Sequence, residues 1–157
     1  MESFSLYKSP FRTSELPQPE ALTTHLTQLL QSDAYNRYCV DCLTALSTHA
    51  VVPFGIFVCQ RCATRHLVAA GGTVPRGGVK CVLTEWWDDA QLRCLELGGN
   101  QRFFEHLQEY APVRAVGVER RYQSEGVKWY QRRLQTLVDG VQQFQERPPA
   151  KDWEEKA

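Results

Sequence analysis

Two Cys-x-x-Cys pairs are the feature that most constrains how this chain folds. Cys39 pairs with Cys42 and Cys59 with Cys62, and sixteen residues separate the pairs. Two intervening residues let both thiolates of a pair reach one ion, and two pairs complete the tetrahedron that zinc prefers. With no ligand position left open, such a site is structural, and its binding energy is folding energy. We therefore predict one structural zinc ion held by these four cysteines; two disulfides or four buried thiols are the alternatives.

The remaining cysteines and one nearby histidine need a different explanation. Cys81 and Cys94 lie in apolar sequence and are expected to be small core residues. Since four thiolates are already available, His49 is expected to pack or to form a hydrogen bond. The first residues contain no apolar signal-peptide core, so we expect an intracellular, reducing compartment, where paired cysteines more often hold metal than form disulfides.

Length and charge exclude several classes of protein. The chain has 157 residues, the size of one domain, and 43% of them are apolar. Eighteen basic residues balance eighteen acidic ones, so no overall field attracts nucleic acid or an anionic membrane. No apolar run approaches the roughly 18 residues of a membrane helix. We expect neither a nucleic-acid partner nor a transmembrane segment.

Patterning divides the chain into an extended arm at 1–20, a domain at 21–144 and a polar tail at 145–157. Residues 71–78 are glycine-rich and predict a loop; Gly78 stands where a phosphate-binding loop requires lysine, so a surface loop is the better interpretation. Apolar periodicity and capping residues, including Asp88 and Asp89, predict the regular elements. The expected helices are 21–32, 59–70, 88–99, 100–110 and a long one at 119–145, and the expected strands are 51–59 and 79–86.

The cysteine spacing resembles that of the GTPase-activating domain of Arf GTPase-activating proteins, whose pattern is Cys-x2-Cys-x16-Cys-x2-Cys. The similarity covers roughly residues 25–140 and favours the Golgi-type subgroup of that family. It implies an α+β fold, a small zinc-finger domain whose short central sheet is surrounded by helices and followed by a long C-terminal helix. The matching positions outside the cysteines are Ala50, Gly55, Phe57, Arg61, Ala63, His66, Val79, Lys80, Val82, Trp87, Leu95, Gly98, Gly99, Asn100, Tyr122, Ser124, Tyr130 and Leu134.

Three departures from the family pattern bear on activity. The family's catalytic arginine lies five residues after the last cysteine, and this position is Leu67 here. The family tryptophan near the zinc is replaced by His49. The segment after Leu67 is about three residues longer than in the family and differs in sequence. These changes gather on the face that the resemblance assigns to the GTPase.

The loss of an arginine at this position has a large expected cost. A positioned arginine neutralises charge on the transferred phosphoryl group and contributes about 10³–10⁵ in rate, roughly 4–7 kcal/mol of barrier. Arg65 lies about 200° around a helix from position 67, and Arg61 lies within the second cysteine pair. Arg76, in the longer loop, is the remaining candidate for a displaced arginine.

The resemblance, together with these departures from the family pattern, is consistent with two alternative functions. The first is a non-catalytic member of the family that acts as a structural or accessory interaction subunit of a larger assembly, with or without a retained surface for an Arf-type GTPase. The second is an active GTPase-activating protein with a displaced arginine. The resemblance implies the cytoplasm, and a mitochondrial or other organelle complex is the alternative. Aromatic and apolar anchors on the two arms favour the subunit hypothesis: Phe4, Leu6, Tyr7, Phe11 and Trp153.

Overall fold

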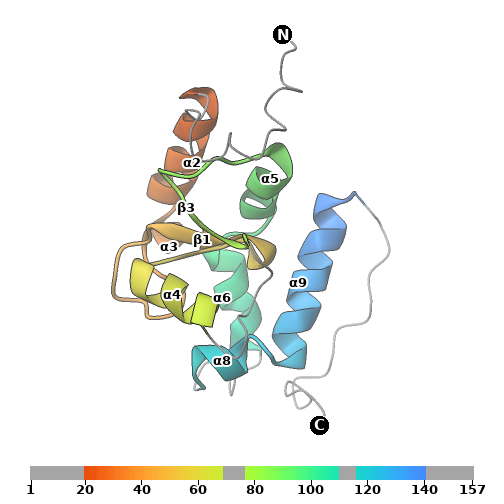
Figure 1. Cartoon of the computed structure of the whole chain (residues 1–157). Coiled ribbons are helices and arrows are strands. Elements are labelled where there is room, and N and C mark those ends of the chain that lie inside the picture. The colour runs from red at the N-terminus through yellow and green to blue at the C-terminus, as the bar shows by residue number, and fades with distance from the viewer. Residues whose placement is uncertain (1–19, 69–76, 110–115, 141–157) are drawn as a thin grey trace.

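The computed structural model describes residues 20–68, 77–109 and 116–140 (Figure 1). Within these ranges, seven α-helices surround a small antiparallel sheet, which confirms the α+β prediction. None of these helices is both long and apolar enough to cross a membrane. The elements are α2 (Glu20–Ser32), α3 (Ala34–Arg37), β1 (His49–Val51), the 3-10 turn η2 (Val52–Phe54), β2 (Ile56–Val58), α4 (Gln60–Val68), β3 (Val79–Cys81), α5 (Asp89–Leu97), α6 (Asn100–Gln108), α8 (Val118–Arg121) and α9 (Glu125–Val138).

The sheet has the strand order β2-β1-β3, with both pairs antiparallel, and separates two apolar cores. Alternate side chains of a strand point to opposite faces. One core joins Val51, Ile56 and Val58 to α4, α6, α8 and α9. The other joins Ala50 and Phe57 to α2 and α5. Figure 1 shows α2 and α5 above the sheet and α4, α6 and α8 below it.

The strand predicted at 51–59 is instead the turn and second strand of a hairpin. β1 starts two residues earlier, at His49, and pairs with β2 so that Val51 faces Ile56. Pro53 has no N–H to donate to a ladder, and Gly55 takes a left-handed conformation with φ 61°. These two residues turn the chain, so the single predicted strand becomes two.

The strand predicted at 79–86 is also shorter, ending at Cys81. The Glu85 side chain accepts a hydrogen bond from the Cys81 backbone N–H at 2.7 Å, so the following residues form a turn closed on the strand. The helix predicted at 88–99 is confirmed as α5. Asp88 is its N-cap, joined to Gln91 in a capping box, Asp89 lies in its first turn and Gly98 is its C-cap.

The long helix predicted at 119–145 is wrong as a single element. It is two helices, α8 and α9, and residues 141–145 lie outside the described ranges. Ser124 ends the first helix by donating to the Arg121 carbonyl at 2.7 Å, and it caps the second by accepting from the Val127 N–H. A serine N-cap favours a new helix start over continuation. The break also turns Arg121 and Tyr122 toward the cysteine region.

Asn100 fastens α6 to the cysteine region. Its side-chain oxygen accepts from the Phe57 N–H at 2.7 Å, and its amide donates to the carbonyls of Tyr35, Tyr38 and Phe57 at 3.0–3.1 Å. Its own backbone N–H donates to the Asn36 side chain. One buried amide thus satisfies backbone groups of α3 and β2, which would otherwise be costly to bury.

Candidate metal centre

The four predicted cysteines meet in one cluster. Their sulfur atoms all lie within 4.8 Å of one another, and all four cysteines are free rather than disulfide-bonded. The Cys42 and Cys59 sulfurs are 3.9 Å apart, which matches the separation of about 3.8 Å implied by zinc–sulfur bonds of about 2.3 Å in a tetrahedron. The cluster therefore forms the site of one structural zinc ion, as the spacing predicts.

Two tight backbone turns place these sulfurs. In the first pair, the Cys39 N–H donates to the Ala45 carbonyl and the Leu43 N–H donates to the Cys39 carbonyl, both at 2.9 Å. In the second, Cys59 follows β2 directly, Cys62 lies in the first turn of α4, and the Cys62 N–H points at the Cys59 sulfur at 3.5 Å. The sheet and α4 thus hold one pair while a closed loop holds the other.

The thiols differ in how easily they ionise. Burial raises the pKa of Cys39 to about 11, and burial with the neighbouring cysteines raises that of Cys62 further. Burial also opposes ionisation of Cys42, but hydrogen bonds from Thr44 and Ala45 outweigh it and lower its pKa to about 6. A buried set of this kind suits a bound dication, because the cation supplies the charge that ionises the buried thiols.

A buried ionic network adjoins the cluster. Asp41, between the two cysteines of the first pair, has a side chain that is 1% exposed. It lies 2.8 Å from His66 Nε2 and 3.1 Å from Arg121 Nη1, and it accepts from the Tyr122 hydroxyl at 2.7 Å. Burial alone would raise the Asp41 pKa. The hydrogen bond and charge of His66, with Tyr122 and Arg121, outweigh it and hold that pKa below its usual range.

The sequence predictions identified His66 only as a matching position and missed its partners. A signal was available: Asp41 is the only Asp, Glu, Lys or Arg between Tyr38 and Gln60. A lone charge in an apolar metal-binding segment is costly to bury unless it is paired. The sequence does not give the partner Arg121, because it lies eighty residues further along the chain.

Leu67, which the resemblance predicts to stand in place of an arginine, lies near the end of α4 with 58% of its surface exposed. Arg65, on the same helix, lies 4.0 Å from Glu119 of α8, and both side chains are about half exposed. Arg61 is exposed on the first turn of α4. Arg76 and most of the glycine-rich loop lie outside the described residues.

Three other predicted residues have ordinary roles. His49 Nδ1 lies 2.8 Å from the Thr48 hydroxyl, as expected for a hydrogen-bonding residue, and burial lowers its pKa against the opposing charge of Glu85. Cys94 is buried in the core as predicted, and burial raises the pKa of its thiol. The same prediction is wrong for Cys81, which is only half-buried on β3 because its strand lies at the edge of the sheet.

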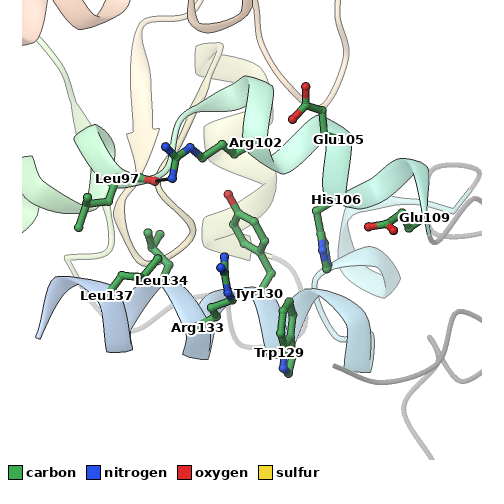
Figure 2. A pocket seen from close by; sticks show the side chains of 10 residues that line it. All are labelled: Leu97, Arg102, Glu105, His106, Glu109, Trp129, Tyr130, Arg133, Leu134 and Leu137. Carbon is green, nitrogen blue, oxygen red and sulfur yellow. Dashed lines mark hydrogen bonds between the residues drawn. The ribbon is translucent and has the colours of Figure 1, made fainter. Parts of the chain in front are cut away.

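A cavity of about 360 Å³ lies between α6 and α9, away from α4 and the cysteines (Figure 2). Arg102 and Arg133 line it together with Glu105 and Glu109, so charges of both signs meet there. Burial raises the pKa of Tyr130 in its wall to about 12, against the charges of the two arginines. The cavity therefore shows no preference for a ligand of either charge.

Comparison with known proteins gives one family. The family model ArfGap, described as "Putative GTPase activating protein for Arf", matches residues 23–137. Among solved structures, the chain is similar to one described as a putative GTPase activating protein for ADP ribosylation factor from Cryptosporidium parvum. The two are 19% identical, with a TM-score of 0.57 over 78% of this chain and 92% of that one. At this identity the likeness concerns the fold.

Replacing one cysteine of the cluster should remove the metal. We expect wild-type protein to bind about one zinc per chain, and Cys62→Ser to lose it and unfold, because three thiolates leave the tetrahedron incomplete. Metal analysis and circular dichroism measure both results. Cys81→Ser is the matched control and should keep its zinc. A folded wild-type chain without metal would contradict the prediction.

Replacing Asp41 should destabilise the fold through Arg121. Asp41→Asn leaves that arginine buried without its counter-charge, which we expect to cost about 3 kcal/mol. Urea unfolding in excess zinc measures the loss. Glu119→Gln removes one partner of the exposed Arg65 pair and should change stability by less than about 1 kcal/mol. Equal losses in the two variants would show that the buried network contributes little.

Proposed function

The chain belongs to the ArfGap family, and we propose that it is a non-catalytic member that serves as a structural or accessory interaction subunit of a larger protein assembly. The observation that carries this proposal is Leu67. By resemblance it occupies the position of the catalytic arginine, and a leucine has no charge to place against a phosphoryl group.

The neighbouring arginines support the same proposal. Arg65 is directed to Glu119 on α8, and on a helix it lies about 200° from position 67. Arg61 is on the turn that carries Cys62, about 1.7 helical turns before Leu67. Neither Arg65 nor Arg61 therefore starts from a backbone position close to that of Leu67 on the helix surface.

The retained residues support a stable scaffold. The cysteine cluster and the Asp41 network hold the first cysteine loop, α4 and α8 together without any contribution from the Leu67 side chain, which is mostly exposed. A chain under selection for folding and binding alone would keep the cysteine cluster and the Asp41 network, and it would tolerate change at Leu67.

The second candidate is an active GTPase-activating protein whose arginine comes from elsewhere, and family membership favours it. Arg76 is the residue most suited to this role, because it lies in the segment that is longer than in the family. An Arf-type GTPase is the partner in this case, and it remains a binding partner in a variant of the first proposal without catalysis.

We expect no activation of GTP hydrolysis. Single-turnover hydrolysis by a GTP-loaded Arf-type GTPase should stay at its intrinsic rate when this protein is added. Leu67→Arg alone should not restore activity, because the segment after it also differs. Stimulation above about a hundredfold would favour the second candidate, and its loss in Arg76→Ala but not in Arg61→Ala would identify the arginine.

We expect the N-terminal arm to hold the protein in its assembly. The arm and the tail lie outside the described residues, apart from Glu20, at which α2 begins. Deleting residues 1–19 should shift a tagged chain in cell extract from a large complex to a small species, with its zinc and helix content unchanged. If the shortened chain stays in a complex of the same size, the arm does not hold the protein in its assembly. The location of the tagged full chain in the cell distinguishes a cytoplasmic protein from a subunit of an organelle complex.

A further inference from the structure

The charges that line the cavity between α6 and α9 lie in two groups (Figure 2). Arg102 and Arg133 both oppose the rise in the pKa of Tyr130, so their positive charges share the end of the cavity where the Tyr130 hydroxyl lies. We call this the positive end. Glu105 and Glu109 line the negative end further along α6, and Glu109 is about 10 Å beyond Arg102 along the helix axis. A ligand that fits both ends therefore carries charges of both signs.

Aromatic side chains that line the cavity join α6 to α9. The His106 ring stacks on Trp129 with 5.8 Å between the ring centroids, and it lies 4.9 Å from the Tyr130 ring. His106 Nε2 donates to the Gly126 carbonyl at 2.9 Å. His106 and Tyr130 are both buried, so these contacts shape the cavity without help from a ligand. Its volume of about 360 Å³ is within the range of ligand pockets, about 300–1,000 Å³.

The chain leaves α9 near the positive end. Gly140 has a φ of 76°, a left-handed conformation that commonly ends a helix and redirects the chain. Its N–H donates to the Leu137 carbonyl at 3.2 Å. Residues 141–157 follow, outside the described ranges. The leucines that line the cavity at this end are Leu97, Leu134 and Leu137.

The sequence after α9 has the charge order that a returning chain needs. Phe144 is followed two residues later by Glu146, and Lys151 comes five residues after Glu146. Alternate side chains of an extended chain share a face, so Phe144 and Glu146 point to one side and Arg147 to the other. A chain that runs back along α9 passes the positive end first, where it brings Glu146, and the negative end second, where it brings Lys151.

The length of the sequence also suits this path. Arg133 lies seven residues before Gly140, about 10 Å along the helix axis. Glu146 is six residues beyond Gly140 and reaches up to about 20 Å from it, which leaves room for the chain to turn. The prolines at 148–149 favour an extended chain of about 3.1 Å per residue. Glu146 and Lys151 are then about 15 Å apart, which is enough to span the two ends of the cavity.

We propose that residues 144–151 of this chain bind in the cavity between α6 and α9, as an extended segment antiparallel to α9. Phe144 contacts the leucines of the positive end. Glu146 pairs with Arg133, and Lys151 pairs with the glutamates of the negative end. Each ion pair is weak because its side chains are exposed. The segment is tethered to α9, however, and tethering gives it a high effective concentration at the cavity.

Cleavage of the zinc-loaded full chain by chymotrypsin tests this proposal. The enzyme cuts after Phe144 when that residue is released, and the rate follows the released fraction. A synthetic peptide of residues 141–157 gives the unprotected rate, and mass spectrometry identifies the cut. We expect the full chain to be cut at least about tenfold more slowly than the peptide. Arg133→Glu should speed the cut by at least about threefold, because it places like charges together.

Arg132→Glu is the matched control for Arg133→Glu. Arg132 is the exposed neighbour of Arg133 on α9 but does not line the cavity, so its replacement should leave the rate unchanged. Cleavage of the wild-type chain at the rate of the peptide would overturn the proposal, as would equal acceleration by the two variants. Protection that increases with protein concentration would assign the segment to a second copy and overturn binding within one chain.

A charge swap separates loss of binding from loss of fold. Glu146→Arg alone should speed the cut as Arg133→Glu does, and the two changes together should restore slow cleavage. Zinc content and circular dichroism should be the same in all of these variants. A double variant that is cut as fast as the single ones would show that Glu146 and Arg133 do not pair, and the proposed register would fall. None of these readouts depends on GTPase activation or on the assembly of the proposed function.

Discussion

The meeting of four cysteine sulfurs at one metal site is the constraint that holds the first cysteine loop against the junction of β2 and α4. The two pairs come from different kinds of structure, a closed loop after α3 and the junction of β2 with α4. The strands between the two pairs form few ladder hydrogen bonds, since each strand of the sheet is three residues long. Metal ligation replaces the missing ladder, and the energy of ligation becomes part of the folding energy.

Asp41 extends this constraint to α4 and α8. Its carboxylate contacts His66 on α4 and Arg121 and Tyr122 at the end of α8. Because Asp41 lies between Cys39 and Cys42, any movement of the metal loop displaces a buried carboxylate that three side chains share. The metal and the ionic network therefore act on the same loop, and the break between α8 and α9 is the geometry that brings Arg121 to it.

Local chemistry predicted the metal ligands, the hydrophobic helices and the capped start of α5, because each depends on residues close in sequence. The failures have different causes. Residues 119–145 have the periodicity of a single helix, which hides the local cap at Ser124, and the contact of Arg121 with the distant Asp41 is not visible in local pattern. Residues 51–59 read as one strand because their apolar composition hides the turn at Pro53 and Gly55. The partners of Asp41 and Asn100 depend on tertiary contacts and were beyond sequence reasoning.

Helix α4 explains how binding and catalysis can separate in this fold. Cys62 and His66 face inward, toward the metal and Asp41, and both are buried. Leu67 is the next residue after His66, yet it faces outward with more than half of its surface exposed. A substitution at position 67 is therefore expected to leave the metal site, the ionic network and the apolar core unchanged. Under our proposal, the arginine was replaceable because the fold did not use it, whereas the neighbouring His66 is a buried partner of Asp41 and its replacement would destabilise the domain.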